Sequence, residues 1–225
     1  VPDTTHVDLL GAPNGVSTMV GSTGLLAPAL FKLWQFNSQV PPIWSDANST
    51  RLRNFALLQS GKRYWGTLTN VTSAASATFI MDTACSAAIE TATWQLGLYS
   101  GLNGFPSTVC FHQDRLVLSG APAYPQQIDM SVNGDYERFA ASGSNLQVAD
   151  NNAISIKLLS TETNQIMWTK SSNQGLMAGS IGPEWQISPS NQSQALTPTN
   201  VNAQPTSYFG SANVDPVQTG NSLLY

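Results

Sequence analysis

The chain has 225 residues, of which 41% are hydrophobic and only 10% carry a charge, against about 25% in an average soluble domain. Ser, Thr, Asn and Gln make up roughly a third of it, and six Trp, eight Phe and six Tyr exclude the aromatic-poor composition of a disordered chain. With a net charge of −4 and nine Lys and Arg, the chain lacks the basic surface expected of a protein that binds nucleic acid tightly. No apolar stretch approaches the roughly 18 residues that span a bilayer.

The first 60 residues carry little periodic signal. Residues 1–27 contain several glycines among small residues and show no sustained helical period, which is typical of loops or short extended pieces. Residues 28–36 fit either a short helix or a strand that is apolar on both faces, and we favour the strand.

A β-meander is predicted next. Three segments rich in aromatic and β-branched residues follow one another, separated by turns rich in Ser, Ala and Thr, at 63–71, 77–81 and 93–99. A dense turn cluster at 101–106 then predicts a boundary. We therefore expect a smaller β-rich unit over residues 1–100, which can also be interpreted as an insertion, and a larger domain over 101–225.

The larger domain begins with three predicted strands, at 108–111, 115–119 and 127–132. The run from Leu116 to Leu118 is continuously apolar, which indicates a strand covered on both faces. The sequence Asn133-Gly134-Asp135 is a strong turn signal after the third strand.

The second half repeats this pattern. Four short strands at a spacing of roughly ten residues match the size of one propeller blade. They are predicted at 153–160, 165–170, 176–180 and 184–188, and segments 201–208, 214–218 and 222–225 begin another such unit. We expect a mainly β fold of short antiparallel sheets, with a propeller-like β domain that is left incomplete because the chain is a fragment of a longer protein.

Few residues are candidates for catalysis. Cys110, His112 and Asp114 alternate along one strand and share a face, but neighbours at i and i+2 stand roughly 7 Å apart, too far for a nucleophile and its base. A β-hairpin with Gln113-Asp114 as its turn, Asp114 as the cap and His112 packed at its end is the favoured interpretation.

Paired carboxylates would be needed for glycan cleavage, and Asp129, Asp135 and Glu137 lie near one another in the sequence. Asp135 fits a local role in its turn, however, and Glu137-Arg138 fits an ordinary solvated pair. No Cys-x-x-Cys, His-x-x-x-His or calcium-type acidic run is present. We therefore predict no catalytic residue, no cofactor and no metal, and two free, partly buried thiols at Cys85 and Cys110.

Several motifs occur in a distinctive order. Gly-Phe-Pro, a strand, Gln-Asp-Arg-Leu and an apolar strand ending in Gly occupy 103–120, followed by Pro-Gln-Gln-Ile-Asp-Met-Ser at 125–131 and Gly-Asp-Tyr-Glu-Arg-Phe at 134–139. Further elements lie at 64–66, 94–97, 150–156, 182–185 and 196–201. Together they resemble the tail tubular protein B, or tail nozzle, family of short-tailed bacteriophages over roughly residues 60 to 225, while residues 1–60 match that family poorly.

The resemblance implies a structural virion protein that is made in the host cytoplasm and assembles as a ring, expected to be a hexamer, beneath the portal and adaptor. Its rings would form a conduit for genome ejection through which DNA passes without specific binding. The resemblance transfers no catalytic residue, so the protein is expected not to be an enzyme. Two alternatives stay open: a receptor- or glycan-binding module at the tail tip, which would contact host surface glycans, and a tail-associated polysaccharide hydrolase.

The motif residues have expected structural roles. Gly104 and Pro106 fix a turn, Leu116 helps to fill the core, and Arg115 pairs with a carboxylate or with backbone carbonyls rather than with another subunit. The remaining structural motif residues are Gly134, Asp135, Tyr136 and Trp185, of which Asp135 caps the turn that leads Tyr136 into packing.

Overall fold

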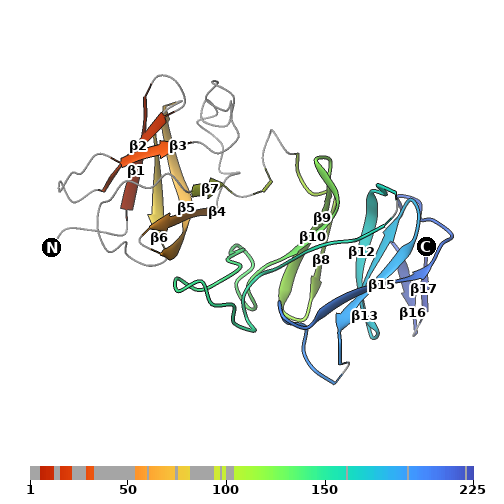
Figure 1. The fold of residues 1–225 in the computed structure, drawn as a ribbon. Helices are drawn as coiled ribbons and strands as arrows, with labels where there is room; N and C mark the ends of the chain where they lie inside the picture. Colours follow the sequence, from red (N-terminus) through yellow and green to blue (C-terminus); the bar gives the residue numbers. More distant parts are fainter. Residues whose placement is uncertain are drawn as a thin grey trace. The chain divides into compact units, whose positions relative to one another are not determined.

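The chain divides into two units, and the described residues of both form strands and loops (Figure 1). The first unit comprises residues 1–102 and 143–147, and the second comprises 103–142 and 148–225. The computed structural model describes residues 6–12, 16–21, 29–32, 54–59, 61–73, 76–81, 94–96, 98–99, 104–160, 162–191, 193–220 and 222–225. These residues contain no helix, and so none that is long and apolar enough to cross a membrane. The predicted mainly β class is confirmed.

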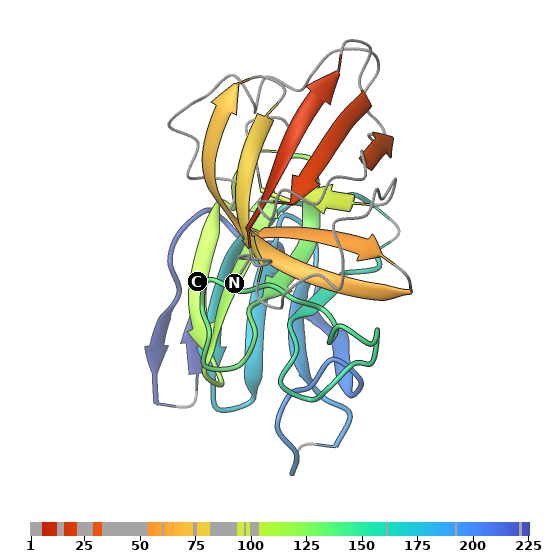
Figure 2. The same ribbon diagram turned by 90° about the vertical axis from the view of Figure 1, so that its left-hand side faces the viewer.

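The first unit holds one seven-stranded antiparallel sheet in the order β3-β2-β1-β6-β5-β4-β7. Its strands are β1 (His6–Ala12), β2 (Val16–Gly21), β3 (Ala29–Lys32), β4 (Asn54–Gln59), β5 (Lys62–Ser73), β6 (Ser76–Met81) and β7 (Trp94–Leu96). Figure 2 shows β4 running across the direction of β1 and β6, and the register of β5 against β6 shifts twice. Such bulges bend a strand, which accounts for the curvature of this sheet.

Of the loops or short extended pieces expected over residues 1–27, the structure has two short strands there, β1 and β2. Small residues and glycines weaken the strand pattern in this part of the sequence. Pairing of β1 with β6 stabilises an extended conformation that local propensity alone does not predict. Within residues 28–36, the predicted strand is confirmed over Ala29–Lys32, which form β3, and the other residues of that range lie outside the described residues.

The second unit contains two four-stranded antiparallel meanders and a terminal hairpin. The first meander is β8 (Thr108–His112), β9 (Arg115–Ala121), β10 (Tyr124–Met130) and β11 (Ile154–Lys157). The second is β12 (Ile166–Ser172), β13 (Gly175–Ser180), β14 (Glu184–Pro189) and β15 (Val201–Ser207), and the hairpin is β16 (Val217–Thr219) with β17 (Ser222–Leu224). In both meanders the strands are paired in chain order.

The predicted grouping of strands 153–160 to 184–188 into one blade is wrong. β11 pairs with β10, from Gln127 opposite Lys157 to Met130 opposite Ile154, and so completes the first sheet. The second sheet starts at β12 and takes in β15. The long connection between β10 and β11 obscures their pairing in the sequence, because pattern reading favours strands close along the chain.

One hydrophobic core lies between the two meanders. It includes Val117, Ile128 and Met130 from the first sheet and Leu176 and Ile187 from the second, each with no measurable exposure. Burying each such side chain stabilises the fold by roughly 1.5–3 kcal/mol, so this core dominates the energetics of the unit.

The first strands of the two meanders, β8 and β12, lie against each other. The hydroxyl oxygens of Thr108 and Thr169 are 3.1 Å apart, and the Thr169 N–H donates to the Thr108 hydroxyl at 3.1 Å. Farther along, the His112 ring and the Ser171 hydroxyl are hydrogen-bonded. Short polar side chains therefore fix how the sheets align at this edge of the core.

The prediction that β9 is covered on both faces is wrong for the described residues. Val117 faces the core, whereas Leu116 and Leu118 lie on the opposite face and are only half-buried. Their neighbours Val109 and Phe111 on β8 are 60% and 59% exposed. A continuous apolar run here marks one core face and one apolar outer face.

Candidate functional site

Four of the predicted motif residues gather around the turn between β8 and β9. Gln113 and Asp114 both have positive φ angles, 46° and 58°, as a two-residue type I′ hairpin requires. The turn that contains Gly134 lies against it, because the Gly134 N–H donates to the Asp114 carbonyl at 2.9 Å and the Asn133 amide donates to the Gln113 carbonyl at 3.1 Å. The predicted hairpin is confirmed, and it is braced by the second predicted turn.

Arg115 is the only fully buried cation in the part of the chain that the structure describes, at 2% exposure. Its guanidinium donates to the carbonyls of Ser131 at 2.7 Å, Asn152 at 2.6 Å and Asp150 at 2.8 Å. Burial lowers the pKa of Arg115 from its ordinary value, although an arginine stays charged in proteins. Of the two partners expected for Arg115, the structure has the backbone carbonyls, and one side chain fixes both the end of β10 and the approach to β11.

Tyr136 packs on the outer side of the turns at 113–114 and 133–134. Its ring packs edge-on against Phe111 with centroids 5.1 Å apart, and its hydroxyl donates to an Asp114 carboxylate oxygen at 2.6 Å. That hydrogen bond raises the pKa of the Tyr136 hydroxyl, because the bond is lost when the phenol ionises. Asp135 stabilises its turn through the backbone, because its N–H donates to the Val132 carbonyl at 3.2 Å, while its side chain is exposed.

The other motif residues lie apart from the turns at 113–114 and 133–134. Gly104 has a φ of 84°, and a Cβ there would lie 2.5 Å from the Pro122 ring, so only glycine fits. Pro106 is half-buried, and Leu116 faces away from the core as described above. Trp185 is 5% exposed and belongs to the core on the side of the second sheet.

The grouping of Cys110, His112 and Asp114 does not form a catalytic triad. His112 Nδ1 lies 2.8 Å from the Ser171 hydroxyl, and burial lowers the pKa of the His112 ring. Cys110 is a free, half-buried thiol, as predicted, whose pKa is raised chiefly by burial. Asp114 lies in the turn and accepts from Tyr136 instead. The predicted thiol at Cys85 lies outside the described residues.

The carboxylates proposed for glycan cleavage occupy different surroundings. Asp129 is within β10 at 8% exposure and accepts from the Gln127 amide at 2.9 Å and the Ser155 hydroxyl at 2.6 Å. Asp135 lies in the exposed turn beyond that strand, and Glu137 follows it. Within the described ranges, no cluster of three or more His, Cys, Asp or Glu could hold a metal ion.

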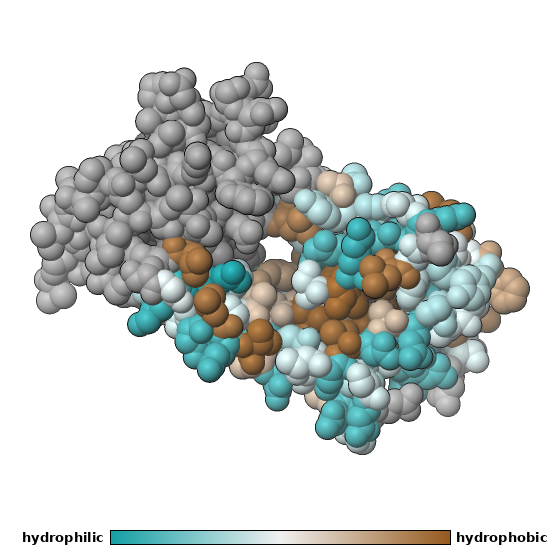
Figure 3. Space-filling model, viewed as in Figure 1, coloured by the Kyte–Doolittle hydropathy of each residue, from teal (hydrophilic) through white to brown (hydrophobic). Residues whose placement is uncertain are grey.

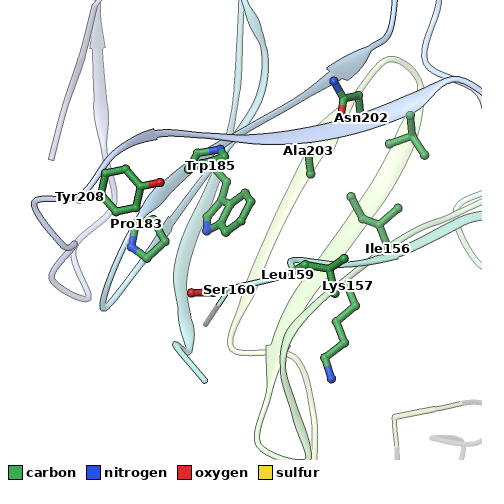
Figure 4. A pocket seen from close by; sticks show the side chains of 11 residues that line it. Ile156, Lys157, Leu159, Ser160, Pro183, Trp185, Asn202, Ala203 and Tyr208 are labelled. Carbon is green, nitrogen blue, oxygen red and sulfur yellow. The ribbon is translucent and has the colours of Figure 1, made fainter. Parts of the chain in front are cut away.

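Sequence reasoning missed a groove of about 530 Å³ between the outer strands β11 and β15. Its floor is formed by Ile156, Trp185 and Ala203, while Lys157 and Tyr208 lie at its rim (Figure 4). Figure 3 shows hydrophobic side chains gathered on the face of the second unit between the two sheets. The aromatic pair at 208–209 could have indicated an exposed site. The groove itself could not be predicted, because it forms only when β11 joins the first sheet and so lies opposite β15.

The chain was compared with protein-family models and with curated proteins, and neither comparison found a match.

Proposed function

We propose that this chain is a structural, non-enzymatic part of a bacteriophage tail nozzle, where its β domain contributes to the wall of a conduit for genome ejection. The observation that carries the proposal is the pair of four-stranded meanders that share a core and meet at their first strands. Blades of a β-propeller are four-stranded meanders of this kind, and adjacent blades pack face to face. The ordered motifs of the sequence support the same family.

The connections of the second unit are tied down in a way that suits a wall. The Arg115 guanidinium and the paired turns at 113–114 and 133–134 fix them through hydrogen bonds to main-chain atoms. Gly104 adds a turn that admits no other residue without displacing Pro122. A conduit that must keep its bore under load benefits from connections fixed in this way.

The charge balance suits the passage of DNA. With a net charge of −4 and nine basic residues, the chain has little to attract phosphates, and affinity for DNA rises with the number of phosphates that Lys and Arg neutralise. In this proposal DNA passes without specific binding, the protein is located in the virion, and its partners are further copies in a hexameric ring together with the portal and adaptor.

Assembly is the decisive test. The protein is purified together with a tail protein that is expected to adjoin it, and the mass of the mixture is measured in solution. Gold-labelled antibody against the chain is applied to particles for electron microscopy. We expect rings, and label on the tail. Monomers under all conditions together with unlabelled particles would refute the proposal.

A further inference from the structure

The walls of the groove between β11 and β15 are two sheet edges that are protected against strand addition. Each of these strands has a single hydrogen-bonded neighbour among the described strands. β15 carries Pro205, which has no N–H to donate, and β11 is only four residues long and ends in Lys157. Proline, lysine and short length are the usual protections of an exposed edge. A ligand in this groove is therefore contacted through side chains rather than as an added strand.

Charge restricts the ligand further. Among the residues that line the groove, Lys157 is the only one with a charge, and none is Asp, Glu or His. In a chain with a net charge of −4, this is a local cationic position that favours an anionic group. Most glycoside hydrolases use a pair of carboxyl groups, which the lining of this groove lacks, and this favours a site that holds a glycan over one that hydrolyses it.

The rim presents an exposed aromatic ring on an anchored segment of backbone. Tyr208 is 77% exposed at one end of the groove, beside Pro183 (Figure 4). The residues around it are anchored: the Ser207 hydroxyl bonds to the Glu184 carboxylate, and the Ser211 N–H donates to the Ser180 carbonyl at 2.8 Å. An aromatic ring offers an apolar face and a polar tip, and the anchored backbone that carries it reduces the entropic cost of binding.

Polar groups complete a lining suited to hydroxyl-rich ligands. The Asn202 amide and the Ser160 hydroxyl supply donors and acceptors, and Figure 4 places Asn202 toward the end of the groove away from Tyr208. A volume of about 530 Å³ is within the usual size of small-ligand sites. An elongated ligand with apolar faces, hydroxyl edges and negative charge matches these features together.

We propose that the groove between β11 and β15 binds an oligosaccharide that carries carboxylate groups, and holds it without cleaving it. Tyr208 packs on the apolar face of one sugar ring, Lys157 pairs with a carboxylate, and Asn202 and Ser160 bond to hydroxyls. Capsular and envelope polysaccharides share this chemistry. The site functions in a single chain, so it does not rest on ring assembly or on the nozzle proposal.

The test is a titration of the ¹⁵N-labelled chain, followed by chemical shifts, with tetrasaccharides of mannuronate, galacturonate and N-acetylneuraminate and with neutral maltotetraose. We expect saturable shifts at residues of the groove with at least one acidic tetrasaccharide, and an affinity for maltotetraose that is about tenfold weaker. The preference should shrink as salt is raised, because Lys157 is exposed. The saccharides should be recovered intact.

Two pairs of variants isolate the contacts. Lys157→Gln should remove the preference for the acidic tetrasaccharide, whereas Lys170→Gln, at a lysine that does not line the groove, should retain it. Tyr208→Ala should weaken binding of every saccharide about tenfold, whereas Phe209→Ala should not, although Phe209 is even more exposed at 92%.

The proposal is overturned if none of the three acidic tetrasaccharides binds saturably, or if Lys157→Gln and Tyr208→Ala bind as the unmodified chain does. Stronger binding of maltotetraose than of the acidic tetrasaccharides would also overturn it. Cleavage of a bound tetrasaccharide would contradict the claim that the site holds a glycan without hydrolysing it.

Discussion

Replacing Arg115 should strongly destabilise the second unit. Arg115→Met removes three short charge-assisted hydrogen bonds and leaves the carbonyls of Ser131, Asp150 and Asn152 without that donor. Removing one partner of a buried charged contact costs about 3–5 kcal/mol, since water replaces a guanidinium poorly at 2% exposure. Arg115→Lys should recover about half of the loss, because an ammonium cannot reach all three carbonyls at once.

Urea unfolding followed by tryptophan fluorescence measures the loss, with Lys157→Met as the matched control on an exposed cation, which is expected to change stability by less than about 0.5 kcal/mol. Because the two units can unfold separately, hydrogen exchange of residues 150–153 supplies the local measurement. These amides should exchange much faster in Arg115→Met. The reasoning fails if that variant lies within about 1 kcal/mol of the unmodified chain or if exchange at 150–153 is unchanged.

Three further outcomes are expected. Burial holds the pKa of His112 below its ordinary 6.5, so on acidification the unfolded chain binds a proton at this ring before the folded chain does. The contribution of His112 to stability should therefore be complete above pH 6.5 and fall as the pH drops below it. His112→Gln, which keeps a donor for Ser171, should flatten the dependence of the urea midpoint on pH. Gly104→Ala should cost roughly 2–3 kcal/mol, and the double variant with Pro122→Ala should recover part of it in a thermodynamic cycle, whereas simple additivity would exclude the clash. Cys110 should be alkylated much more slowly in the folded chain than in urea, as measured by peptide mapping, because burial raises the pKa of its thiol; equal rates would contradict its burial.

Local chemistry made much of the second unit predictable. Residues that tolerate positive φ indicate hairpin turns, and for that reason the sequence predicts a turn at Asn133-Gly134. The position of Arg115 at the start of a predicted buried strand indicated a partner that is a carboxylate or a set of backbone carbonyls, and the structure has the carbonyls. Such features depend on a few neighbouring residues, so the sequence contains the information needed to predict them.

Pairing between distant segments was not predictable in the same way. β11 joins the first sheet across a connection of more than twenty residues, and β1 pairs with β6, which lies more than sixty residues later in the chain. The groove of the candidate glycan site depends on both sheets, since Ile156 and Trp185 come from different meanders. No pattern within either segment specifies that these two side chains share a floor, so the site was visible only in the structure.

β12 shows how one residue can redirect a strand between two layers. Strict alternation would place Ile166 and Trp168 on one face, but the register against β13 shifts between them. Ile166 consequently faces the shared core, whereas Trp168, at 1% exposure, lies against Tyr225 on the other side with ring centroids 5.0 Å apart. Gly179 makes room for the indole, since a Cβ there would lie 2.2 Å from it. A sheet packed between two layers needs apolar side chains on both faces, and in β12 the shift of register supplies them, with Ile166 toward the shared core and Trp168 toward Tyr225.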